Sequence, residues 1–314
     1  MSEPLVTARG LRVGVPAVDG NGHDWPVDGV DLIIPPRSSI ALVGASGSGK
    51  SLTARALLGL APPGGTVRAA ELTVAGVAVL DASDETRRRL RGGTLGLLAQ
   101  DADAALNPVL RIAEHFRESA VAHGGPKGWR DHAADLLATV DLEPEAALRA
   151  YPHQLSGGQR RRATLALALA PGPACLIADE PTSGLDVLSR AKVLDTLDEA
   201  IARDRRSLVH ITHDLAVAAD RTGTVAIMVH GEIVELGPTA ATLGRPRHPF
   251  TRRLVAAARA DAPDSTLPSR RHVSGCRFAA SCPDVDARCR AEVPAWIGDA
   301  EAGVRCHRIE EAGS

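Results

Sequence analysis

Residues 38–60, SSIALVGASGSGKSLTARALLGL, constrain the fold of this chain more than any other stretch. Residues 40–44 form an apolar run typical of a buried strand, and residues 52–60 are typical of a helix. Between them, Gly44, Gly49, Lys50 and Ser51 fill the fixed positions of a phosphate-binding pattern. The stretch therefore predicts a strand–loop–helix unit of an α/β domain whose loop holds phosphate groups.

The chemistry expected of this loop follows from its residue types. Glycines let successive backbone N–H groups curve around phosphate oxygens, and the helix N-terminus adds the positive end of its dipole. Lys50 can reach the β- and γ-phosphates of a nucleotide, and the Ser51 hydroxyl is a ligand for Mg²⁺. The predicted binding residues here are Gly44, Ala45, Ser46, Gly47, Ser48, Gly49, Lys50, Ser51 and Leu52.

A second candidate anion site lies at residues 155–159, in the sequence LSGGQ. Ser156 is a good helix N-cap, and Gly157 and Gly158 expose backbone N–H groups at the start of a helix-forming run. Taken alone, such a helix start is most often only a cap. Residues 160–162, three consecutive arginines, would alone be typical of a solvated helix face.

Two further apolar runs end in residues suited to catalysis. Residues 174–179 read as a buried strand ending at Asp179, with Glu180 next, and residues 207–213 read as another ending at His213. Several apolar strands separated by helices predict a parallel α/β sheet, whose ligands bind at the carboxyl ends of the strands. Asp179, Glu180 and His213 all lie at such ends.

Composition and charge exclude several classes of protein. The 314 residues are 44 % hydrophobic and 24 % charged with a net charge of −2, so no basic field favours nucleic acid. The N-terminal sequence lacks the apolar run of a signal peptide. The longest uncharged run, residues 163–178, contains prolines and glycine and is too short to span a bilayer. These features predict a cytoplasmic chain with reduced thiols.

The order of the motifs resembles that of the ATP-binding-cassette family over about residues 5–240. The phosphate loop is followed by Gln100 in LGLLAQD, the LSGGQ signature, CLIADE, the D-loop SGLD and His213 in ITHD. The resemblance implies an α/β fold in which a RecA-like parallel sheet core carries an antiparallel β subdomain and a helical subdomain at about residues 101–170. We expect this cassette at residues 1–240 and a small Cys-rich C-terminal extension at residues 241–314, packed separately from the phosphate loop.

The resemblance also implies the roles of the motif residues. Two cassettes pair head to tail, and ATP lies between the phosphate loop of one and the signature of the other. Glu180 is the implied general base, His213 contacts the γ-phosphate, and Lys50 holds the phosphates. The implied Mg²⁺ ligands are Ser51, Gln100 and, through water, Asp179; the signature residues facing the partner's ATP are Leu155, Ser156, Gly157, Gly158 and Gln159, and Asp186 lies at the dimer seam.

One departure from the family concerns adenine. The family usually stacks adenine on an aromatic residue near the N-terminus, and Val15 stands at that position here. Trp25 is nearby but out of register. Either an aliphatic surface at Val15 or the ring of Trp25 is the expected contact.

Three local sequences are similar to those of the dipeptide, oligopeptide and nickel importer ATPases. They are Tyr151-Pro152-His153 before the signature, Leu106-Asn107-Pro108 after Gln100, and His248-Pro249-Phe250-Thr251 after the cassette. The resemblance implies an ATP-hydrolysing subunit of a bacterial importer, most simply for peptides. Nickel or a metal chelate is the alternative cargo, and a soluble cassette ATPase acting on DNA or ribosomes is a remote alternative.

The resemblance further implies the partners of the chain. These are two transmembrane permease subunits, a second cassette ATPase, with a heterodimer favoured over a homodimer, and indirectly an extracytoplasmic solute-binding protein. Nucleic acid is not expected. The implied location is peripheral, at the cytoplasmic face of the inner membrane.

Four of the five cysteines lie in the C-terminal extension, at Cys276, Cys282, Cys289 and Cys306. Thiol clusters in a reducing compartment usually bind metal, and four thiolates suit zinc or a [4Fe–4S] cluster. Spacing alone leaves zinc, iron–sulfur and unliganded thiols open, whereas the family resemblance implies the [4Fe–4S] cluster, with His307 as a reserve ligand. Because the extension has little apolar content, a metal would stabilise it. Cys175 is expected to be a core residue.

Overall fold

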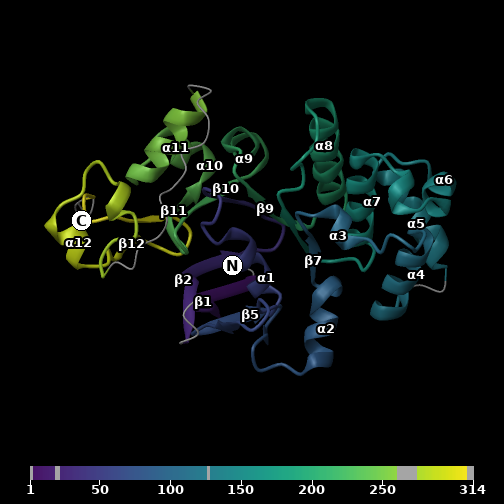
Figure 1. The fold of residues 1–314 in the computed structure, drawn as a ribbon, viewed down its shortest axis with the longest axis horizontal. Helices are drawn as coiled ribbons and strands as arrows, with labels where there is room; N and C mark the ends of the chain where they lie inside the picture. The colour runs from purple at the N-terminus through teal and green to yellow at the C-terminus, as the bar shows by residue number, and fades with distance from the viewer. Residues whose placement is uncertain (1–2, 18–21, 126–127, 260–273, 310–314) are drawn as a thin grey trace. The chain divides into compact units, whose positions relative to one another are not determined.

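The computed structural model describes residues 3–17, 22–125, 128–259 and 274–309. Its contacts divide the chain into two compact units (Figure 1). The first unit contains Ala82–Val209 with Met1–Glu3 and Pro35–Ser38, and the second contains Pro4–Ile34, Ser39–Asp81 and His210–Ser314. The domain boundary near residue 240 stays a prediction. In the described part of the chain, no helix combines the length and the apolar character needed to cross a bilayer.

An antiparallel sheet in the second unit matches the expected β subdomain. Its strands lie in the order β2 (His23–Ile34), β1 (Val6–Pro16), β5 (Glu71–Val74) and β6 (Val77–Ala78), and β4 (Thr66–Arg68) also pairs with β1. Its apolar side chains are buried, as β-branched and aliphatic residues on one face of a sheet require.

The second unit also contains part of a second sheet, which has eight strands among the described residues. β3 (Ser39–Val43) pairs in parallel with β10 (Thr224–Val229), which pairs antiparallel with β11 (Glu232–Pro238). The helices of this unit before the Cys-rich segment are α1 (Lys50–Leu57), α9 (Leu215–Arg221), α10 (Thr239–Gly244) and α11 (Pro249–Arg259). The predicted strand, phosphate loop and helix are therefore β3, residues 44–49 and α1.

The C-terminal extension packs on the same core as the phosphate loop. Its hairpin, β12 (Trp296–Gly298) and β13 (Gly303–Arg305), continues the sheet because β13 pairs with β11. Phe278 shares a buried cluster with Val43 and Ala45, against which Cys276 and Cys282 also pack. The short helices η2 (Ala279–Ser281) and α12 (Ala287–Ala291) complete it. The expectation of separate packing is wrong, because a segment with little apolar content buries its few large side chains in the existing core.

The first unit contains the expected helical region. Its elements are α2 (Asp84–Gly93), β7 (Leu95–Leu98), α3 (Ala102–Ala105), α4 (Ile112–His123), α5 (Trp129–Thr139), α6 (Pro144–Arg149), η1 (Pro152–Gln154), α7 (Gly157–Leu169), β8 (Cys175–Asp179) and α8 (Val187–Arg203). β7 and β8 pair in parallel, and β9 (Ser207–Thr212) runs from this unit into the other. Cys175 is buried in β8, where burial raises the pKa of its thiol to about 12, as expected for a core residue.

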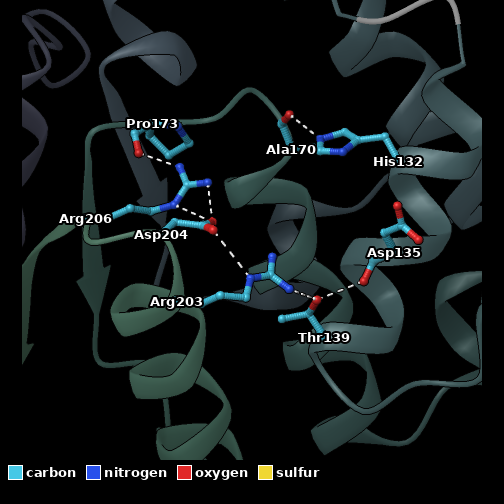
Figure 2. A network of polar contacts seen from close by, with 8 residues as sticks. All are labelled: His132, Asp135, Thr139, Ala170, Pro173, Arg203, Asp204 and Arg206. Atoms are coloured by element: carbon cyan, nitrogen blue, oxygen red, sulfur yellow. Dashed lines mark hydrogen bonds and ion pairs between the residues drawn. The ribbon is translucent and has the colours of Figure 1, made fainter.

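A polar network fixes the segments that flank β8 (Figure 2). After α8, Asp204 pairs with Arg203 and Arg206, and hydrogen bonds to Arg206 hold the pKa of the Asp204 carboxyl below its usual value. Arg206 donates to the Pro173 carbonyl, just before β8, and Arg203 donates to the Thr139 hydroxyl at the end of α5, 2.6 Å away. The end of α8 is thereby tied to both α5 and the start of β8.

The importer-like stretch His248-Pro249-Phe250-Thr251 opens helix α11. The His248 N–H donates to the Glu235 carboxylate at 3.0 Å, and its Nδ1 accepts from the Phe250 N–H at 3.1 Å. The imidazole also packs against the ring of Phe278, with 5.6 Å between ring centroids. Burial, with a smaller contribution from Arg252, lowers the pKa of His248 to about 3, so the buried imidazole is neutral.

A His248→Asn variant tests this arrangement through pH. The unfolded chain binds a proton near pH 6.5 and the folded chain only near pH 3, so the stability that neutral His248 confers is complete above pH 6.5 and declines below it. Urea unfolding at pH 7.5 and pH 5 should show the gap between wild type and variant narrowing at pH 5 by about 2 kcal/mol. A gap that is the same at both pH values would contradict a buried neutral His248.

Candidate functional site

The phosphate loop is held in a closed form by its own lysine. Lys50 is only 5 % exposed, and its Nζ donates to the carbonyls of Gly44 and Ala45 at 2.7 and 3.0 Å. Gly44 passes so close to the Met228 carbonyl that a Cβ would clash with it, and Gly49 has a φ of 102°. Both positions therefore require glycine, and the Lys50 ammonium is held by hydrogen bonds against the first two residues of the loop.

His213 belongs to the same unit as the phosphate loop. It follows the last residue of β9 and is exposed. The next residue, Asp214, caps α9 by accepting from the N–H groups of Ala216 and Val217 at 2.9 and 3.3 Å. The cap fixes where the strand turns into the helix, so the His213 backbone has a defined position at the carboxyl end of β9.

Gln100 and Glu180 meet within the first unit. The Gln100 side-chain amide donates to a Glu180 carboxylate oxygen at 3.3 Å. Asp179 is buried at the end of β8, and Glu180 adopts a left-handed backbone conformation with a φ of 44°. Such a conformation is unfavourable for a residue with a side chain and is found most often at functional sites.

The signature forms the helix start that the sequence predicts. Ser156 Oγ accepts from the Gln159 N–H at 3.2 Å, and the Gln159 side chain accepts from the Ser156 N–H at 2.9 Å. This reciprocal cap begins α7 and leaves Ser156 and Gly157 exposed. Asp186 of the D-loop caps α8 by accepting from the Ser189 N–H at 3.0 Å, and hydrogen bonds from the Ser189 side chain and then from its N–H hold the pKa of the Asp186 carboxyl below its usual value.

Arg161 has a role that the sequence reading missed. Its side chain is not on a solvated face: the residue is 3 % exposed and donates to the carbonyls of Ala99 at 2.7 Å, Gln100, and Glu180 at 3.3 Å. It also lies 3.4 Å from the Ser183 hydroxyl in the D-loop segment. The signal was present in the spacing, because residues 161, 165 and 169 fall on one buried face of α7.

The predicted magnesium ligands are divided between the two units. Ser51 belongs to the second unit, and Gln100 and Asp179 belong to the first. Their convergence on one ion stays a prediction. The adenine contact also stays open: the Trp25 ring lies beneath the Arg12 guanidinium, 4.2 Å from its centroid, and Val15 is half-buried in β1.

The four cysteines of the extension do not form a ready metal site. In the described ranges, no three His, Cys, Asp or Glu side chains are gathered in a way that could hold a metal ion. Burial, with smaller contributions from the other three thiols, raises the pKa of the Cys276 thiol to about 11. The Cys276 N–H donates to the Cys289 carbonyl at 2.8 Å, and the ring of His307 lies 2.9 Å from the Glu292 carbonyl. The predicted cluster thus receives no support from a preformed ligand group.

Known proteins resemble the chain along most of its length. DppD, the dipeptide transport ATP-binding protein of Caldanaerobacter subterraneus subsp. tengcongensis, is 37 % identical over 303 residues, covering 90 % of this chain and 91 % of that protein. DppD of Escherichia coli (strain K12) is 36 % identical over 302 residues, covering 91 % and 92 %. A solved dimeric ATP-binding cassette, bound to ADP and Pi after hydrolysis, matches with a TM-score of 0.65 at 25 % identity, covering 74 % of this chain and 98 % of that one.

The phosphate loop and the cassette fold define a P-loop nucleotide-binding protein. The family model for the ABC transporter matches residues 27–183, and the model for the oligopeptide/dipeptide transporter C-terminal region matches residues 234–289. The chain belongs to the ABC transporter family, in the branch that carries this C-terminal region. The resemblance drawn from the motifs is thereby confirmed.

Arg161→Ala tests whether the buried guanidinium holds the segment of Ala99 and Gln100, together with Glu180, in place. Its loss leaves the partly buried carbonyls of Ala99, Gln100 and Glu180 without their donor, and each such group costs about 1 kcal/mol. We expect a loss of about 3 kcal/mol in unfolding free energy. The control is Arg149→Ala, which removes an exposed pair with Glu145 and should change stability by less than about 0.5 kcal/mol. Equal effects of the two substitutions would refute the role of Arg161.

Proposed function

We propose that this chain hydrolyses ATP to drive the import of di- or oligopeptides through a membrane transporter. The observation that carries the proposal is the phosphate loop, to whose carbonyls Lys50 donates, in a chain whose C-terminal part matches the oligopeptide/dipeptide transporter region. The names of the dipeptide transport relatives support peptides over nickel as cargo.

In the proposed mechanism the phosphates of ATP replace the carbonyl oxygens that Lys50 now contacts. The Lys50 ammonium and the N–H groups of residues 44–51 hold the β- and γ-phosphates. Ser51 and Gln100 would hold Mg²⁺, with Asp179 acting through water; the ion supplies charge neutralisation to the phosphates. The oxygen-rich donor set of hydroxyl, amide and carboxylate suits this ion.

Glu180 is the proposed general base, and His213 the proposed contact to the γ-phosphate. The bond from Gln100 places the Glu180 carboxylate beside a proposed metal ligand, where it can take a proton from the attacking water. The left-handed backbone at Glu180, directly after β8, is a strained conformation of the kind that occurs at functional sites and is consistent with this role.

We propose that the signature acts on the ATP of a second cassette. Ser156 and Gly157 are exposed at the start of a helix of 13 residues, an arrangement that favours binding of an anion from outside the chain. The solved relative described as dimeric and bound to ADP and Pi supports pairing of cassettes. Asp186 would lie at the seam, the partner would be a related but different ATPase, and two permeases would hold the pair at the cytoplasmic face of the membrane.

Glu180→Gln tests the catalytic assignment. The amide keeps the shape of the side chain but cannot accept a proton, so ATP should bind normally while hydrolysis falls by about 100-fold or more. Equilibrium binding of Mg·ATP and steady-state phosphate release in the assembled transporter measure the two effects separately. Lys50→Ala is the control that should lose binding itself. Near-normal turnover by Glu180→Gln would remove Glu180 from its role.

We also propose that Cys276, Cys282, Cys289 and Cys306 take up a [4Fe–4S] cluster, with zinc as the alternative. Supporting this are the donor set of four thiols and their mutual effect on pKa. Because the thiols are not arranged as a ligand group among the described residues, uptake requires their side chains to rearrange. No step of ATP hydrolysis depends on this proposal.

Metal analysis of anaerobically purified protein tests the cluster. About four iron and four sulfide per chain are expected, with broad absorption near ~400 nm. Cys282→Ser should lose most of the iron, whereas Cys175→Ser, in the buried strand β8, should retain it. One equivalent of zinc would replace the iron–sulfur assignment, and four freely titrating thiols would exclude both metals.

A further inference from the structure

Arg277, in the C-terminal extension, is a nearly buried cation with no part in the mechanism above. Its guanidinium is 10 % exposed and has three kinds of partner, all in the second unit. Nε pairs with the Glu232 carboxylate at 2.7 Å, and Nη1 donates to the His230 carbonyl at 2.9 Å. Nη2 contacts the Asp28 carboxylate and donates to the Asp28 carbonyl at 3.1 Å.

One of these partners, His230, lies in the tight turn between β10 and β11, and another, Glu232, directly follows that turn as the first residue of β11. His230 and Gly231 form the whole loop between Val229 and Glu232, and both have positive φ values, 46° and 85°. Two such residues are typical of a two-residue hairpin turn. A Cβ on Gly231 would clash with the Pro26 carbonyl of β2, so the turn lies against that strand without space between them.

The same turn contacts the phosphate loop. The Gly231 N–H donates to the Ser48 carbonyl at 2.9 Å, and the Gly231 carbonyl accepts from the Asp28 N–H at 3.0 Å. A Cβ on Gly49 would meet Pro26, Val27 and Met228 at 3.0 Å. The turn is therefore hydrogen-bonded directly to the phosphate loop. Arg277 in turn is hydrogen-bonded to both the turn and β2.

The charges around Arg277 make this contact strong and directional. The Glu232 side chain is 8 % exposed and that of Asp28 is 24 % exposed, so both pairs are largely removed from water. Arg12 also pairs with Asp28 at 2.6 Å, which leaves two cations facing two carboxylates. A guanidinium that donates to a fixed carbonyl and two carboxylates at once defines an orientation that a single ion pair would not.

We propose that Arg277 is a positioning residue for the phosphate loop. It fixes the turn at residues 230–231, the turn fixes the Ser48 carbonyl, and the loop keeps the curvature in which Lys50 and the glycine N–H groups meet phosphate. The C-terminal extension thereby sets the affinity of the cassette for ATP. The inference rests on the proposed nucleotide role of the loop, and a purely structural role for Arg277 would stabilise the extension without changing nucleotide affinity.

The test compares Arg277→Met with Arg308→Met in the full chain. Arg308 lies in the same extension, is half exposed and pairs with Asp286 at 3.2 Å. We expect Arg277→Met to weaken equilibrium binding of Mg·ATP by about tenfold, within the range of coupling between linked sites, and Arg308→Met to leave it unchanged. Arg277→Lys keeps the charge but not the planar fork, so its affinity should lie between those of wild type and Arg277→Met.

Amide hydrogen exchange gives a second readout that does not require nucleotide. In Arg277→Met, the amides of residues 44–51 and 230–232 should exchange faster, while α7 in the other unit keeps its protection. If Arg277→Met does not fold, Arg277→Lys decides by the same two measurements. Unchanged Mg·ATP affinity with unchanged exchange in the phosphate loop overturns the proposal. Failure of the wild type to bind Mg·ATP would instead refute the proposed function, and the exchange experiment would still decide the role of Arg277.

Discussion

The close approach of Gly44 to the Met228 carbonyl is the contact on which the nucleotide site depends. A side chain at residue 44 would push the loop away from β10, and Lys50 would then no longer lie over the carbonyls of Gly44 and Ala45. Backbone-to-backbone packing of this kind leaves no adjustable side chain between the elements. The loop can therefore be only as well ordered as the strand and turn beneath it.

The sequence predicted those elements that are defined by residues close together in the chain. The strand–loop–helix at residues 39–57, the cap at Ser156 and the strand ending at Asp179 all follow from short-range rules. Arg161 was misread because a run of three arginines indicates solvent exposure, whereas its neighbours at helical spacing indicate burial. Its acceptors lie far away in sequence, and no local pattern identifies them.

The packing of the C-terminal extension was also beyond sequence reasoning, for a related physical reason. Its low apolar content correctly indicates that it cannot form a core alone, but several solutions satisfy that constraint, including a metal centre and docking on an existing core. The extension docks on an existing core, because Phe278 packs into the buried cluster that contains residues of β3. Which solution a chain adopts depends on whether a neighbouring surface offers matching cavities and partners, such as the ring of His248 and the carboxylate of Glu232.

The pairing of β13 with β11 has a consequence for solubility. β11 contains Ile233, Val234 and Leu236, and β13 pairs with its Glu235 and Leu236, so those backbone groups are not left as an open sheet edge. An uncovered apolar edge strand invites pairing with another molecule. The short hairpin therefore protects the cassette against self-association, and a chain shortened before β12 would be expected to aggregate through this edge even if its phosphate loop folded correctly.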